Sequence, residues 1–368
     1  MLAAVVQKFP KMRVVRDAYQ VLADLEASAD DSVGAIVRYP AVGAWAMRCL
    51  REEVDPTGLT AVALAAAHRA GRSCSFPVPA HNGWITLPSI GSHPAQGTVD
   101  VEVGPGAPAP EGWRPLPTIG AGGHTFTLDD LDPHLSPPDS VDVGPLEPDV
   151  RNTWQIRLDE AWNVLTRDYW TVRDEIATAI TTLVPVGASG GLAQSSSSRE
   201  AFGAIILSTP SDGVSMAETL AHENQHVKLY ALMDLVALLN PDSGRRYYAP
   251  WRSDPRPARG LLNGTYAYLG VTGFWRRRMR AGDRRAEVEF AEWRAPALQA
   301  TRDLLGGTDL TPTGVRFVEG MARTMELWNE EPVGAEALAK ARRRREEHRA
   351  SWERSNPSVR SVADRSRS

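Results

Sequence analysis

The chain has few cysteines, no excess of basic residues and no long apolar run. Its two cysteines, Cys49 and Cys74, lie in different segments and neither forms a C-x-x-C pair. This argues against a metal site built from thiolates and fits a reducing compartment. The 41 Lys and Arg residues are outnumbered by 45 Asp and Glu residues, which gives a formal net charge of -4. We therefore expect no nucleic-acid partner, because binding to a phosphate backbone requires a basic surface.

Membrane-spanning and secretory segments are also lacking. No stretch approaches the roughly 20 consecutive apolar residues that cross a bilayer. The apolar start at residues 1–6 is followed at once by Gln7 and Lys8, too early for the apolar region of a signal peptide. We therefore expect a cytoplasmic protein without a membrane partner. Its 368 residues, 42% of them hydrophobic, are enough for one large domain or two ordinary ones.

The N-terminal third predicts helices followed by short strands. Apolar residues recur at spacings of three and four between residues 11 and 71, which is typical of a helical layer. Strand-like runs at 75–78 and 84–87 are separated by Asn82-Gly83, a pair that favours a β-hairpin.

A segment rich in Pro and Asp, 133–148, indicates a domain boundary. We expect an N-terminal helical and small β region at 1–150, a mostly helical metal-binding region at 151–355 and a frayed tail at 356–368. The fold class is therefore α+β, with a small antiparallel sheet. The helices expected after the boundary are 155–180, 215–239, 258–281, 284–305, 312–329 and 336–354.

One motif carries chemistry. The helix expected to begin at a Ser215/Glu218 capping box contains His222-Glu223-Asn224-Gln225-His226, an H-E-x-x-H pattern. Histidines four residues apart lie on one face of a helix, so both rings can reach one ion. The opposing interpretation is a pair of buried histidines that only hydrogen-bond their neighbours.

The spacing leaves the metal and its third ligand open. In a zinc peptidase, Glu223 would be the general base for a metal-bound water. Two histidines and one carboxylate would equally suit the Fe(II) of a non-haem oxygenase. We predict Glu287 as the third ligand, because it shares a helix face with apolar residues, although a salt bridge would explain it too. His124 and His134 are weaker alternatives.

The residues around the motif resemble a known family, the HExxH-motif domains of gene clusters for ribosomally made, modified peptides. The resemblance is carried by residues 201–204, 217–229, 247–252, 260–275 and 289–294, and by Tyr39-Pro40-Ala41-Val42-Gly43-Ala44-Trp45. Some members place a histidine on the helix that corresponds to 258–281, where this chain has Asn263 and Tyr268. The resemblance therefore leaves the third ligand undecided.

This resemblance implies an enzyme that uses Fe(II) and 2-oxoglutarate to hydroxylate a β-carbon of a ribosomal precursor peptide. It also implies a partner, a radical-SAM maturase of the same cluster. The far carboxylate of 2-oxoglutarate needs a planar cation, for which Arg252 and Arg256 are our candidates. The alternatives are a zinc-dependent peptidase and a non-catalytic peptide-binding protein. The sequence identifies neither the peptide, nor the residue modified, nor the oligomeric state.

Overall fold

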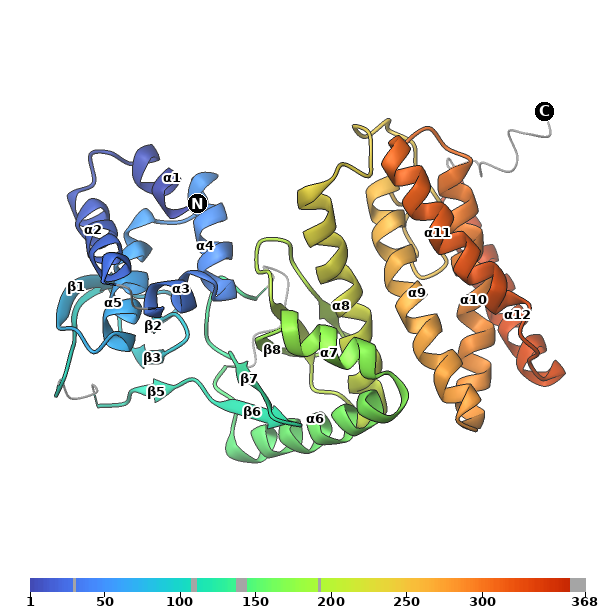
Figure 1. Cartoon of the computed structure of the whole chain (residues 1–368), viewed down its shortest axis with the longest axis horizontal. Helices are drawn as coiled ribbons and strands as arrows, with labels where there is room; N and C mark the ends of the chain where they lie inside the picture. The colour runs from blue at the N-terminus through green and yellow to red at the C-terminus, as the bar shows by residue number, and fades with distance from the viewer. Residues whose placement is uncertain (29–30, 107–110, 137–143, 191–192, 358–368) are drawn as a thin grey trace. The chain divides into compact units, whose positions relative to one another are not determined.

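The computed structural model describes residues 1–28, 31–106, 111–136, 144–190 and 193–357. They form two compact units, and Figure 1 labels most of their helices and strands. The first unit holds residues 1–162 with 177–213, and the second holds 163–176 with the chain from Val214 onward. The predicted α+β class is confirmed, since most elements are helices and the strands form small sheets. Within the described ranges, no helix combines the length and the apolar content that crossing a bilayer requires.

The helical layer expected near the N-terminus is confirmed. α2 (Arg13–Ala27) buries Val15, Ala18, Leu22 and Leu25, the three- and four-residue spacing of one helix face. α5 (Leu59–Arg69) is apolar on all sides and buried from Leu59 to Ala67, because α2, α3 (Ser32–Val37) and β1 (Cys74–Pro79) all pack against it. The other members of the layer are α1 (Leu2–Lys8), α3 (Ser32–Val37), α4 (Pro40–Leu50) and the 3-10 turn η1 (Pro56–Gly58).

The Asn82-Gly83 turn forms, but the hairpin predicted around it is wrong. Both residues have positive φ angles, 52° and 83°, and a single bridge joins His81 to Trp84 across them. The strands on either side of the turn pair with later strands of the chain and not with each other. The turn therefore determines only the local backbone direction. β1 (Cys74–Pro79) pairs with β4 (Thr98–Val103), and β2 (Trp84–Leu87) pairs with β3 (Gly91–Pro94), which also pairs with β5 (Arg114–Pro115).

A five-stranded sheet with the order β6-β7-β8-β10-β9 completes the first unit. β8 (Thr182–Val186) and β10 (Ala204–Ser208) are parallel and buried at every position, as expected of central strands. β6 (Thr118–Ala121) and β7 (His124–Leu128) form an antiparallel hairpin, and β9 (Ser195–Ser196) pairs antiparallel with β10. The sheet is therefore mixed rather than antiparallel, because β7 and β8 are also parallel. β8 to β10 belong to the first unit although they follow residue 150.

One helix expected at 155–180 is divided into two. α6 (Pro148–Asp168) and α7 (Trp170–Ala179) are separated by Tyr169. The ring of Tyr169 lies 6.5 Å from that of Phe274, and the guanidinium of Arg277 lies over it at 4.7 Å. The break therefore coincides with a tertiary contact of the second unit.

The second unit is a set of long helices. α10 (Arg284–Leu305) lies beside α9 (Ala258–Arg280), α11 (Pro312–Asn329) and α12 (Ala335–Ser355), as Figure 1 shows. Side-chain caps begin two of them: Asp283 accepts the N–H of Arg285, and Thr311 accepts that of Gly314. The four predictions for α9 to α12 are confirmed to within one residue at each end. α8 (Gly213–Leu235) begins two residues earlier and ends four residues earlier than expected.

Candidate metal site

His222 and His226 lie one turn apart on α8, and their rings converge. The two Nε2 atoms are 3.2 Å apart, with ring centroids separated by 4.9 Å. The neighbouring residues Leu220, Ala221, Val227 and Leu229 are buried, which holds this turn of α8 in the core. The His222 side chain keeps 22% exposure, so the pair lies in the wall of the unit and remains accessible from outside.

The convergent nitrogens fit one metal ion. Two nitrogen ligands at about 2.1 Å from an ion, roughly 90–110° apart, lie about 3.0–3.4 Å from each other. Burial lowers the pKa of His222 to about 3, helped by His226, and burial lowers the pKa of His226 to about 4. Both rings are therefore neutral near pH 7, which is the form that binds metal. A hydrogen bond between the two Nε2 atoms would explain the same distance without an ion.

Aromatic rings surround the pair. Tyr268 of α9 meets His222 edge to face at 5.5 Å, and Tyr230 stacks on His226 at 6.2 Å. Tyr268 is itself held between Trp251, stacked at 4.6 Å, and Trp293 of α10 at 4.4 Å. Burial raises the pKa of Tyr268, so its hydroxyl stays protonated. Tyr268, Trp251 and Trp293 lie in the segments that carry the family resemblance, and Tyr230 lies four residues after His226 on the same helix face.

Glu223 is buried next to the pair. It is 1% exposed, and its Oε1 atom lies 4.0 Å from Nε2 of His222. Burial raises the pKa of Tyr230, and the negative charge of Glu223 raises it further. The carboxylate of Glu223 therefore acts electrostatically on the Tyr230 hydroxyl. A carboxylate in this position can accept a proton from a water molecule bound beside the histidines.

Contacts between α8 and α9 fix the position of the motif. The indole N–H of Trp275 donates to Oε1 of Glu218 at 2.7 Å, one turn before His222. One turn after it, Nε2 of Gln225 donates to the carbonyl of Tyr266 at 3.4 Å. The capping box is wrong as the helix start, because α8 already begins at Gly213. Glu218 instead helps to join the two helices that carry the site.

The opposite face of the motif is held by α7. Asn224 donates to one carboxylate oxygen of Glu175 at 2.9 Å, and Lys228 pairs with the other at 2.8 Å. These two contacts with Glu175 restrain the rotation of α8 about its axis. The ammonium group of Lys228 is thereby paired with a carboxylate and points away from the histidine pair.

The third ligand stays a prediction. Glu287 lies in the first turn of α10, and its Oε1 accepts the N–H of Gly334 at 2.7 Å. His124 lies on β7, with Nε2 3.1 Å from the carbonyl oxygen of Ile180. No group of three His, Cys, Asp or Glu side chains in the described part of the chain is close enough to hold an ion. The two imidazoles are thus not joined by Glu287.

Arg252 and Arg256 share one carboxylate. Nε of Arg252 and Nη1 of Arg256 lie 2.9 and 2.8 Å from the two oxygens of Asp254. Two cations and one anion leave a net charge of +1, which can hold a further carboxylate. The charge of Arg252 also lowers the pKa of Tyr268, opposing the effect of burial. This places the arginine cluster within electrostatic reach of the tyrosine that contacts His222.

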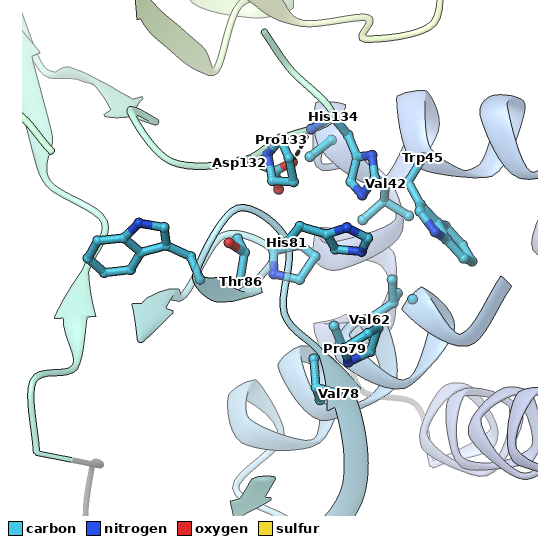
Figure 2. Close-up of a pocket in the computed structure, with 15 residues that line it drawn as sticks. Val42, Trp45, Val62, Val78, Pro79, His81, Thr86, Asp132, Pro133 and His134 are labelled. Atoms are coloured by element: carbon cyan, nitrogen blue, oxygen red, sulfur yellow. Dashed lines mark hydrogen bonds between the residues drawn. The ribbon is translucent and has the colours of Figure 1, made fainter. Parts of the chain in front are cut away.

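His134 lines a separate pocket in the first unit (Figure 2). The figure shows its ring turned toward His81, with Trp45 beside them, and the two imidazole centroids are 5.9 Å apart. Burial lowers the pKa of His134 to about 4, helped by His81 and Arg48. The space inside is about 40 Å³, enough for a water molecule or an ion and too small for a peptide side chain.

Beside this pocket lies a buried acid pair that sequence analysis missed. The hydroxyl of Tyr39 donates to Oδ2 of Asp129 at 2.5 Å, and Oδ1 of Asp129 accepts the N–H of Asp132 at 3.0 Å. Burial, followed by the charge of Asp129, raises the pKa of Asp132 to about 8. The run of acidic residues directly after β7 is the one sequence signal, but only burial distinguishes it from a solvated loop.

No protein-family model matches the chain, and a search of curated proteins finds no significant match.

Proposed function

We propose that this protein is an Fe(II)- and 2-oxoglutarate-dependent oxygenase that hydroxylates a β-carbon of a ribosomally made precursor peptide. The observation that carries the proposal is the pair of neutral, convergent Nε2 atoms of His222 and His226, 3.2 Å apart. The resemblance of the surrounding residues to HExxH-motif domains supports this choice of chemistry. A radical-SAM maturase of the same gene cluster is the proposed protein partner.

Each group of residues has a role in this proposal. His222 and His226 would hold the iron, and Glu287 is the predicted third ligand, which would first have to leave its bond with Gly334. When bound, iron and 2-oxoglutarate activate O₂, so that one oxygen atom enters the peptide and the other enters succinate as CO₂ is lost. The burial of both imidazoles keeps them deprotonated for ligation. Tyr268 orients His222 and limits the access of water to it.

We propose a cytoplasmic location for this reaction. Ribosomal precursor peptides are made there, and Fe(II) requires a reducing compartment. The two free cysteines, Cys49 and Cys74, fit that compartment.

The proposal is tested with a precursor peptide, which it expects to be encoded beside the gene. Protein loaded anaerobically with Fe(II) is mixed with peptide, 2-oxoglutarate and O₂. We expect succinate release and a peptide heavier by one oxygen atom, measured by mass spectrometry. Peptide that stays unmodified while the protein holds iron and no succinate forms would contradict the proposal.

A zinc-dependent peptidase is the second candidate, and the position of Glu223 favours it. A buried carboxylate 4.0 Å from a metal-binding nitrogen suits the general base of metal-assisted hydrolysis. This candidate predicts cleavage of the peptide by Zn²⁺-loaded protein without 2-oxoglutarate. Glu223→Gln would then abolish cleavage and leave zinc bound. Bound metal with neither reaction would instead favour a non-catalytic peptide-binding protein.

Replacing Arg252 by glutamine is expected to raise the KM for 2-oxoglutarate about tenfold, corresponding to roughly 1.4 kcal/mol. The change removes one of the two cations around Asp254 and cancels the net positive charge of the cluster. Steady-state succinate formation at varied 2-oxoglutarate measures the effect. Arg13→Gln, which removes an exposed arginine of α2 in the first unit, is the matched control and should leave KM unchanged. An unchanged KM in the Arg252 variant would remove this cluster from the cofactor site.

A further inference from the structure

The second unit contains a groove that the histidine site does not use. It has a volume of about 690 Å³, within the range of roughly 300–1,000 Å³ for ligand sites. One wall is the face of α10 from Ala295 to Asp303, and the other is the face of α12 from Arg345 to Glu353. Eight residues of helix extend about 12 Å. The groove is therefore long enough for about four residues of extended chain.

The two helices run in the same direction, which gives the groove distinct ends. Glu287 near the start of α10 binds Gly334 at the start of α12, and Arg344 pairs with Glu292 further along. Arg345 follows directly and lies on the first α12 turn of the groove. Asp303 lies on the last α10 turn, so these two charges lie toward opposite ends.

Most charges around the groove already have partners. Arg302 pairs with Glu326 at 3.3 Å, Arg349 pairs with Glu353 at 2.5 Å, and Glu346 accepts from Arg342 at 2.7 Å. Each of these charged lining residues is therefore neutralised by a partner of opposite sign. Two charged residues of the lining have no such ion pair in the part of the chain that the structure describes.

Arg345 and Asp303 are those two charges. Arg345 has neither an ion pair nor a hydrogen bond with any described residue. Asp303 accepts the amide N–H of Gln299 at 2.9 Å and forms no ion pair within 4.0 Å in the described ranges. Burial raises the pKa of Asp303, and the charges of Arg349 and Arg245, neither within ion-pair distance of its carboxylate, offset this effect only in part. A ligand with both signs of charge would satisfy both ends.

Apolar and amide groups line the middle of the groove. Pro296 and Leu298 of α10 contribute apolar surface, Tyr248 contributes an aromatic ring, and Gln299 and Asn329 contribute amides. Amide side chains can donate to and accept from a peptide backbone, and the apolar surface suits a small hydrophobic side chain.

We propose that this groove binds an extended peptide segment of about four residues, with an acidic side chain near Arg345 and a basic side chain near Asp303. The groove is close to the histidine pair. Trp293 precedes Ala295 by two residues and Trp251 follows Pro250, and both rings hold Tyr268, which contacts His222. The inference rests on the proposed function only in identifying this segment as part of the substrate peptide.

Binding is measured by ligand-observed NMR with three capped tetrapeptides: Lys-Ala-Leu-Asp, Asp-Ala-Leu-Lys and the uncharged Gln-Ala-Leu-Asn. We expect the protein to bind one charged order at least fivefold more tightly than the other and more tightly than the uncharged peptide. The exchanged variant Arg345→Asp/Asp303→Lys should invert the preference between the two charged orders. Arg343→Gln, on α12 outside the groove lining, is the control and should preserve it.

Equal binding of all three peptides, no binding, or a preference that survives the exchange would overturn the proposal. The measurement is repeated with His222→Ala. Retained peptide binding in that variant would show that the groove acts independently of the metal. The proposed oxidation chemistry can therefore fail while the groove proposal stands, and the reverse also holds.

Discussion

Replacing His222 by alanine is expected to lower the affinity of the protein for Fe(II) at least a hundredfold. The change removes one of the two nitrogen donors whose Nε2 atoms lie 3.2 Å apart. Loss of even an outer partner of a metal ligand typically costs ten- to a hundredfold in affinity, so loss of the ligand itself should cost more. Anaerobic titration with Fe(II), and metal analysis after gel filtration, measure affinity and stoichiometry.

His68→Ala is the matched control, because His68 is an exposed histidine at the end of α5. It should retain one metal ion per chain. Circular dichroism of the His222 variant establishes that loss of metal does not follow from unfolding. Full metal occupancy in folded His222→Ala protein would exclude the histidine pair as the site, and with it both enzymatic candidates.

The helices of the second unit could be predicted closely because their ends depend on nearby residues. Asp283 and Thr311 supply side-chain caps, and Pro312 fixes the first turn of α11. Between such ends, apolar residues at helical spacing define the buried face. Local sequence contains all of this information, so α9 to α12 agree with their predicted ranges.

Predictions failed where distant residues decide. Asn82-Gly83 forms its turn, but β1 pairs with β4, about 25 residues away in its register, instead of with β2. Glu218 fits a capping box in sequence, but its carboxylate accepts from Trp275, 57 residues later. The local pattern predicts the turn at Asn82-Gly83 correctly, and it makes a capping role for Glu218 plausible. Tertiary packing, however, determines which strand β1 pairs with and which group Glu218 binds.

The candidate site divides in the same way. The spacing of His222 and His226 is local, and the helix brings the two rings together. The hydrogen bond of Glu287 to Gly334, 47 residues later, depends on how separate segments fold onto each other. The two ion pairs of Asp254 are local, because Arg252 and Arg256 each lie two residues away from it. The position of a residue on a helix face indicates whether its side chain points toward the core. It does not indicate which other side chain or backbone group it contacts there.

Replacing Asp132 by asparagine is expected to stabilise the first unit increasingly as the pH rises from about 4 to 8. The pKa of Asp132 in the folded protein, about 8, lies above its ordinary value of 3.8. A raised carboxyl pKa contributes stability that is fully present below pH 3.8 and is lost as the pH rises toward 8. A tenfold change in proton affinity corresponds to about 1.4 kcal/mol, so the whole pH window can reach roughly 5 kcal/mol. The titrations of Asp129 and Asp132 are coupled, so only part of this free energy belongs to Asp132. We expect the variant to be more stable than the wild type by about 2 kcal/mol or more at pH 8.

Urea unfolding of both proteins at several pH values, followed through the first-unit transition, measures this difference. Asparagine retains the Oδ1 atom that accepts the N–H of His134 at 2.9 Å, so the variant loses the charge and keeps the turn. Glu102→Gln, on the exposed face of β4, is the control and should follow the wild-type pH dependence. Equal free energies of unfolding for wild type and Asp132→Asn at pH 5 and pH 8 would mean that Asp132 ionises normally in the folded protein. The acid pair would then have to be hydrated rather than buried, and the wall that it forms beside His134 would be open to solvent.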